Sequence, residues 1–207
     1  MMAVPARRTL TPDEFFDWLT GQEGRYELVD GVPMAMTGAN RRHDRIVVNG
    51  LVALGARLKG RKCHPFTADT AVRITSGNIR FPDFGIECGR PPDRSIAAAE
   101  RRLVAEVFSP SSKTFDETEK LEEYKSVPGL DHILLIDPDW PQARLWWRDG
   151  EGPWQSRRES GLEAVVAFPA LDVALPLAEL YDGLEFQPRP MLVDVTPADL
   201  AEGRWKI

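Results

Sequence analysis

The chain has few of the residues that build disulfide scaffolds or zinc sites. Its 207 residues include two cysteines, Cys63 and Cys88, and three histidines. Neither residue type occurs in the CxxC or HxxxH spacing that is typical of zinc sites, and two cysteines do not make a disulfide framework. We therefore expect two free thiols in a reducing cytoplasm.

Long apolar runs are also missing. No stretch approaches the roughly 18 apolar residues of a membrane-spanning helix. The N-terminal stretch MMAVPARRTL has two arginines but no apolar segment or cleavage site behind them. We therefore expect neither a secretory signal nor a membrane partner, and a cytoplasmic protein.

Basic residues are not in excess: the chain has 26 Lys and Arg against 32 Asp and Glu, a net charge of −6. This argues against a protein that coats nucleic acid through bulk charge. It does not argue against an enzyme on nucleic acid, because carboxylates that hold metal ions add negative charge locally. Basic residues do gather at 41–45, 57–62 and 101–102, either as solvated surface or as phosphate contacts.

The hydrophobic content of 43% is ordinary for a globular protein. We expect a single domain over residues 1–187 and a C-terminal arm over 188–207, which differs in composition. At the N-terminus, Thr11 and Glu14 have the spacing of a helix capping box. RYELVDG and VPMAMTG then predict a hairpin that turns at Asp30-Gly31.

The order of elements from Arg42 to Pro138 predicts a mixed α/β sheet. RRHDRIVVNGLVALGARLKG favours a helix whose buried face is spaced as His43, Val47, Leu51, Leu54 and Leu58. Two strand-like segments follow, and then RRLVAEVFSP, a strand covered on both faces. The helix ETEKLEEYKS, capped by Asp116, and the strand HILLIDP complete a helix–strand–strand–strand–helix–strand core. ARLWWRDG and WQSRRES then indicate an antiparallel pair.

Two carboxylates stand in this apolar pattern without an evident partner. Asp83 begins one strand, and Glu106 lies near the end of another with apolar neighbours on its own face. If those strands are antiparallel neighbours, the two carboxylates meet at one edge of the sheet. A divalent cation, Mg²⁺ or Mn²⁺, would compensate both charges and leave room for a phosphate. A turn residue and a structural salt bridge remain the alternatives.

Lys120 lies in the helix after Glu106, with Tyr124 one turn further on the same face. A lysine there could stabilise negative charge on a reacting phosphate. Among Glu119, Glu122 and Glu123 it could equally be a solvated lysine.

Several motifs together resemble a known family. RYELVDG, FPDFGIECG, LVAEVFSPSS, EKLEEYKSVPGLDHILLIDPD and ARLWWRDG are similar to the Uma2 family of bacterial proteins, described as restriction endonucleases and part of the PD-(D/E)XK nuclease superfamily. The resemblance runs from about Thr9 to Phe186. It implies the restriction-endonuclease-like α/β core, preceded by the N-terminal helix and hairpin.

The resemblance also implies roles for individual residues. Asp83 and Glu106 would be metal ligands and catalytic residues, with the backbone carbonyl of Val107 as a third ligand. The superfamily lysine is replaced here by Phe108, and Lys120 is similar to a lysine that has moved onto the following helix. Three further residues could join the site: Glu27, His43 and Tyr124.

The sequence therefore favours a Mg²⁺- or Mn²⁺-dependent endonuclease that acts on DNA as a homodimer. Two alternatives stay open. The chain could be an inactive dimeric interaction or regulatory module on the same fold, or a hydrolase of a small phosphodiester.

Overall fold

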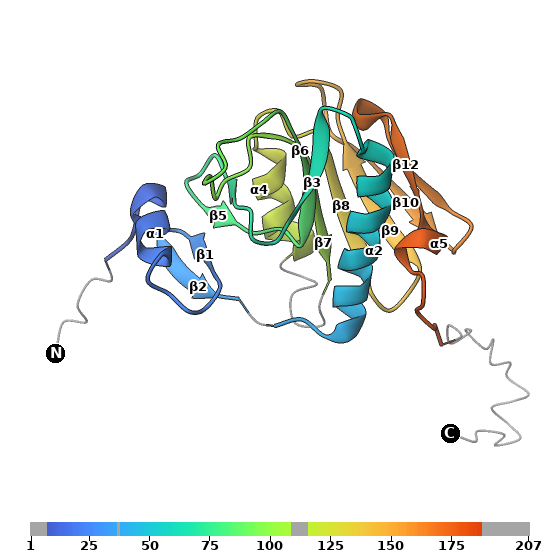
Figure 1. Cartoon of the computed structure of the whole chain (residues 1–207), viewed down its shortest axis with the longest axis horizontal. Helices are drawn as coiled ribbons and strands as arrows, with labels where there is room; N and C mark the ends of the chain where they lie inside the picture. The colour runs from blue at the N-terminus through green and yellow to red at the C-terminus, as the bar shows by residue number, and fades with distance from the viewer. Residues whose placement is uncertain (1–7, 37, 109–115, 188–207) are drawn as a thin grey trace, which may run out of the picture.

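The computed structural model of the chain describes residues 8–36, 38–108 and 116–187. It has a mixed α/β fold, as expected, built around a six-stranded sheet with the order β10-β9-β8-β7-β6-β3 (Figure 1). A four-stranded sheet, β2-β1-β5-β4, and a two-stranded sheet, β11-β12, accompany it. The predicted C-terminal arm, 188–207, lies outside the described residues.

The helical segments are α1 (Pro12–Leu19), α2 (Arg41–Leu58), the π-helical η1 (Asp116–Lys120), α4 (Leu121–Lys125), the 3-10 turn η2 (Pro169–Leu171) and α5 (Leu177–Leu180). The strands up to the middle of the chain are β1 (Tyr26–Val29), β2 (Val32–Ala35), β3 (Cys63–Thr67), β4 (Val72–Arg73), β5 (Ile79–Arg80), β6 (Phe84–Cys88) and β7 (Glu100–Val107). The later strands are β8 (His132–Asp137), β9 (Gln142–Trp147), β10 (Gln155–Ser160), β11 (Val165–Phe168) and β12 (Val173–Pro176).

The N-terminal helix and hairpin form as predicted. The side chain of Thr11 accepts a hydrogen bond from the Glu14 amide, and the Glu14 carboxylate accepts one from the Thr11 amide. The hairpin turns at Asp30 and Gly31, which both have positive φ, at 49° and 76°, as a tight two-residue turn requires. Its strand β1 also pairs with β5, so the hairpin extends into the four-stranded sheet.

Strand β7 is the centre of the larger sheet. It pairs antiparallel with β6 and parallel with β8, and residues 103–107 are all buried. Its side chains alternate between two apolar clusters: Leu103, Ala105 and Val107 pack with α2, and Val104 and Phe108 pack with α4. Helix α2 crosses one face of this sheet in Figure 1, and α4 lies behind it.

The expected order of core elements contains one excursion. Between β3 and β6 the chain forms the short strands β4 and β5, which belong to the four-stranded sheet. The antiparallel pair β9 and β10 is confirmed. The predicted cap by Asp116 rests on a side chain outside the described residues, and the helix there begins as a π-helical turn and ends at Lys125.

Leu54 and Leu58 lie on the buried face of α2 as predicted, but His43, Val47 and Leu51 are not among its buried residues. The buried residues are Ile46, Gly50, Ala53, Leu54 and Leu58, whereas Val47 and Leu51 are only partly buried. Gly50 explains the difference, because a Cβ there would lie 2.8 Å from the Phe84 ring. The helix approaches the sheet closely at this glycine, which turns Val47 and Leu51 toward the helix border.

The prediction of two free thiols is wrong: Cys63 and Cys88 form a disulfide. The two residues lie directly opposite each other in the antiparallel pair of β3 and β6, with Cα atoms 3.9 Å apart. Cross-strand contact therefore brings together two cysteines that are 25 positions apart in sequence. Spacing along the chain gave no sign of this register.

The sequence contained no apolar run long enough for a membrane-spanning helix, and the helices of the structure can be compared with that expectation. Over the described ranges, no helix combines the length and apolarity that crossing a bilayer requires.

Candidate active site

Asp83 and Glu106 come from neighbouring strands. Strands β6 and β7 are antiparallel, with Phe84 opposite Ala105, so Asp83 stands at the end of β6 beside the end of β7. One carboxylate oxygen of Asp83, Oδ2, accepts a hydrogen bond from the Val107 amide at 2.7 Å. The two strand ends therefore lie together at one edge of the sheet, and the expected meeting of the two carboxylates stays a prediction.

His43, from the first turn of α2, contacts the same carboxylate. Its Nε2 lies 3.0 Å from Asp83 Oδ2, and the side chains of His43 and Asp83 are only 13% and 18% exposed. Asn40 caps this turn by accepting hydrogen bonds from the Arg42 and His43 amides. The helix start thus fixes the backbone from which His43 reaches Asp83.

Glu106 points to the other face of β7, where it is buried. The hydroxyl of Tyr124 donates to Glu106 Oε1 at 2.6 Å, and the Nζ of Lys120 lies 3.3 Å from the same oxygen. Lys120 and Tyr124 are four residues apart and so project from one face of the helical segment. This geometry excludes the solvated-lysine alternative, because the Lys120 side chain is only 11% exposed.

Further charged residues surround Lys120. Its Nζ also lies 3.2 Å from Glu27 Oε1, and Glu27 Oε2 accepts a hydrogen bond from Arg80 at 2.9 Å. Arg80 uses its Nε and Nη2 for a bidentate contact with Glu123, at 2.5 and 2.9 Å. We call Glu27, Arg80, Glu106, Lys120 and Glu123 the charged cluster.

The charged cluster carries three carboxylates and two cations, a net negative charge when all five are ionised. Burial lowers the pKa of Arg80, but the hydrogen bonds to Glu123 and the charge of Glu27 outweigh it, so its pKa is raised overall. Burial, together with the charge of Glu106, raises the pKa of Tyr124 well above its ordinary value. Tyr124 is therefore a neutral donor and Arg80 a permanent cation.

Arg80 and Glu123 were missed from the sequence. Arg80 stands between Ile79 and Phe81, and an arginine inside an apolar segment is a signal of a buried ion pair. The place of the superfamily lysine, Phe108, is part of the apolar cluster around Tyr124. The cation that reaches Glu106 comes instead from Lys120 on the following helix.

The donor set fits a small, hard cation in its chemistry. Two carboxylates, of Asp83 and Glu106, and the Val107 carbonyl are oxygen ligands of the kind that Mg²⁺ and Mn²⁺ prefer. Among the residues that the structure describes, no three Asp, Glu, His or Cys side chains converge as a ready-made metal cage. Mg²⁺ does not require one, because it retains several waters and binds through one or two carboxylates.

A groove leads to Asp83. It has a volume of about 590 Å³ and is lined by Asp83, His43, Arg25 and Arg41, with the acidic Asp69 also on its wall. Asp44 also lines it, so the exposed Arg25 and Arg41 stand beside three carboxylates and the groove carries charges of both signs.

The basic residues at 57–62 are mostly engaged within the chain. Arg57 pairs with Glu179, Arg61 with Asp172 and Lys62 with Glu100. Arg42 donates to the backbone carbonyls of Pro138 and Glu185. The exposed Arg41 and Arg45 are therefore better placed than the 57–62 cluster to contact a phosphate backbone.

Comparisons with known proteins agree with this architecture. Residues 12–178 match a family model described as "Uma2: Putative restriction endonuclease". The curated relatives include the Synechocystis proteins slr1290, 28% identical over 86% of this chain and 94% of its own length, and sll1609, 25% identical over 84% and 100%. Both are named as uncharacterized proteins.

One solved structure shows the same fold. It comes from Anabaena variabilis and is described as a "putative nuclease belonging to DUF820". The two folds superpose with a TM-score of 0.66 over 83% of this chain and 97% of the other, at 18% identity. With the family model matching most of its length, the chain belongs to the Uma2 family.

Proposed function

We propose that this protein is a metal-dependent endonuclease that hydrolyses phosphodiester bonds in DNA. The observation that carries the proposal is the junction of β6 and β7. There Asp83 binds the Val107 amide, and the adjacent Glu106 is held by Lys120 and Tyr124. Two acids and a lysine at the end of a sheet, in a chain of the Uma2 family, are the residues that hydrolysis of a phosphodiester needs.

Asp83, Glu106 and the Val107 carbonyl would hold Mg²⁺ or Mn²⁺. When bound, the ion polarises the phosphate and lowers the pKa of the attacking water. His43 fixes the orientation of the Asp83 carboxylate through Oδ2, and the Val107 amide contacts the same oxygen. The chain thus holds one of its two acids rigid before any substrate arrives.

Lys120 supplies positive charge beside Glu106. Its ammonium lies between Glu27 and Glu106 at 3.2 and 3.3 Å, so two carboxylates fix its direction. A cation held in a largely buried place stabilises the negative charge that develops on the phosphate in the transition state. Tyr124 keeps Glu106 in position by donating its hydroxyl proton.

The groove beside Asp83 would receive the DNA backbone, with Arg25 and Arg41 contacting phosphates. Cutting both strands would need two such sites, which a symmetric homodimer provides. Analytical ultracentrifugation tests the dimer separately from activity.

The test is a plasmid-nicking assay with Mg²⁺ or Mn²⁺, accompanied by calorimetric titration of each ion. Asp83→Asn, Glu106→Gln and Lys120→Met should each lower the nicking rate at least about a hundredfold. Asp83→Asn and Glu106→Gln should also weaken ion binding, whereas Lys120→Met should not.

Two matched controls separate catalysis from folding. Glu87→Gln changes a buried carboxylate on β6 that accepts a hydrogen bond from the Ala99 amide, and Lys62→Met breaks the surface pair with Glu100. Both should nick at close to the wild-type rate. A wild-type protein that binds neither ion and never nicks DNA would refute the proposal and favour the interaction module.

A further inference from the structure

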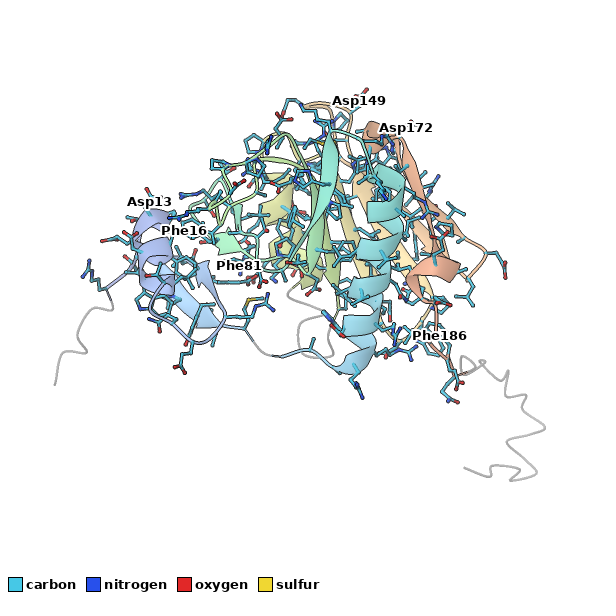
Figure 2. The ribbon with its side chains drawn as sticks, in the orientation of Figure 1. Asp13, Phe16, Phe81, Asp149, Asp172 and Phe186 are labelled. Atoms are coloured by element: carbon cyan, nitrogen blue, oxygen red, sulfur yellow. A yellow bond between two sulfur atoms is a disulfide. The ribbon has the colours of Figure 1, made fainter. Side chains whose placement is uncertain are left out.

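A second cavity adjoins the groove on the side of the N-terminal helix. It has a volume of about 240 Å³, and its walls are mainly apolar. Three aromatic rings contribute to it, those of Phe16 on α1, Tyr26 on β1 and Phe81 after β5. Figure 2 shows the labelled Phe16 and Phe81 in the region where α1 and the β1–β2 hairpin lie next to β5.

This cavity is pre-formed, because packing contacts hold the side chains of its walls in place. The Tyr26 ring makes an edge-to-face contact with Trp18, with ring centroids 4.8 Å apart. It also lies over Gly24, where a Cβ would be 3.0 Å from the ring. Phe16 and Phe81 are buried in the same apolar cluster. A cavity with pre-positioned rings is typical of a ligand site.

The cavity and the groove share part of their walls. Arg25, Ala68 and Asp69 line both, and the Arg25 guanidinium donates to the Ala68 carbonyl across the boundary at 2.6 Å. Phe81 lines the cavity and Asp83 lines the groove. Because these two residues are two positions apart, their Cα atoms are at most about 7 Å apart. One nucleotide can therefore span from the candidate active site into the cavity.

We propose that this cavity receives an unpaired nucleobase of the DNA strand whose phosphate lies at Asp83. The assignment of the phosphate rests on the proposed function; the base subsite rests on the cavity itself. A nucleobase is flat and stacks on aromatic rings, and Phe16, Tyr26 and Phe81 supply them. Arg25 at the shared boundary is placed for the phosphate that links the two subsites.

The consequence is a preference for distorted DNA. Taking a base out of a paired duplex costs unstacking and unpairing energy, and that cost is smallest where the base is already unpaired. The protein should therefore bind a site with an unpaired base more tightly than the same sequence fully paired.

The experiment measures binding without divalent ions, so that cleavage plays no part. Two dye-labelled duplexes of one sequence serve as probes, with a central adenine opposite either an abasic site or thymine. Fluorescence anisotropy should give about tenfold tighter binding of the abasic-site duplex. Ala68→Trp, which fills the shared boundary, should abolish the difference in affinity between the two duplexes.

Two pairs of variants test whether the loss of the preference for the abasic-site duplex is specific to the cavity. Ala56→Trp places the same side chain on the exposed face of α2 and should retain the tenfold preference. Ile96→Ala trims the cavity wall and should reduce the preference, whereas Leu162→Ala changes a residue of similar exposure, 41% against 43%, and should not.

The outcomes separate the two proposals. A wild type without preference for the abasic-site duplex, or an Ala68→Trp protein that keeps it, overturns the base subsite even if nicking is observed. A preference that depends on Ala68, in a protein that never nicks DNA, supports the subsite and refutes the nuclease.

Discussion

Both faces of β7 are packed with apolar side chains, but only one of them also holds a buried charge. Toward α2, Leu103, Ala105 and Val107 pack among apolar side chains. Toward α4, Glu106 lies in the same strand but is bound to Lys120 and Tyr124, in contact with the rest of the charged cluster. An apolar face depends on volume alone, whereas a buried charged face depends on every partner being present. The charged side chains around Glu106, which could take part in a reaction, therefore lie on the α4 face of β7. Each prediction below tests this difference between the two faces.

The largest effect is expected from the cation at the centre of the charged cluster. Arg80→Met removes the main counterion of the buried Glu27 carboxylate and of the partly buried Glu123 carboxylate, and should lower the free energy of unfolding by about 3–5 kcal/mol. Urea denaturation measures it. Arg61→Met, which breaks an exposed pair with Asp172, should cost no more than about 0.5 kcal/mol. Equal losses in the two variants would contradict the comparison.

A titrating residue next to the apolar face should make stability pH-dependent. Burial lowers the pKa of His132 to about 4, although its Nδ1 hydrogen bond to the Arg102 carbonyl opposes the shift. Below a pH of about 6.5, the ordinary pKa of histidine, His132 becomes protonated in the unfolded chain but stays neutral in the folded chain. Stability is therefore complete above that pH and is lost as the pH falls toward 4, by about 3 kcal/mol.

The check is a series of urea denaturations between neutral pH and pH 4 on the wild type and His132→Gln. The variant cannot titrate at this position, so the wild type should lose more stability on acidification than the variant does. Parallel stability curves for the two proteins would show that His132 does not contribute.

Tyr124→Phe probes the charged face with the smallest change of volume. It removes the hydroxyl that donates to Glu106 while Lys120 stays in place. The loss of one hydrogen bond to a buried carboxylate should cost about 1.5–3 kcal/mol of unfolding free energy. Tyr26→Phe is the matched control, because its ring packs against Trp18, and it should change the unfolding midpoint little.

The smallest effect tests the apolar face through two glycines of one helix. Gly50→Ala places a Cβ 2.8 Å from the buried Phe84 ring, and the strain should exceed the gain in helix propensity by about 1 kcal/mol. Gly55→Ala meets only Pro65, at 3.4 Å, and should stabilise by about 0.5–1 kcal/mol. Thermal unfolding of both variants should show shifts of opposite sign.

Much of the fold followed from local patterns in the sequence. The capping box at Thr11, the turn at Asp30-Gly31 and the apolar run of β7 each report on contacts within a few residues. The two acids were found because Asp83 and Glu106 interrupt apolar runs. Local chemistry was therefore sufficient for many of the elements, and the roles of Asp83 and Glu106 stay predictions.

The parts that could not be predicted depend on contacts between distant segments. The charged cluster joins Glu27, Arg80 and Glu123 from three different elements, and nothing in the spacing of these residues along the chain records their contact. The first half of α2 buries Ile46 and Gly50 in place of Val47, because one glycine allows a close approach to Phe84. The pairing of Cys63 with Cys88 required the register of two strands.

That disulfide encloses the segment that carries Arg80, Phe81 and Asp83 within a covalent ring. A protease that cuts the exposed turn around Ser76 would therefore yield two fragments still joined through sulfur. An electrophoresis gel run without reductant would show one band of nearly full size, and a gel run with reductant would show two. The peptide bearing Asp83 would remain tethered to the one bearing α2 after the backbone between them is severed.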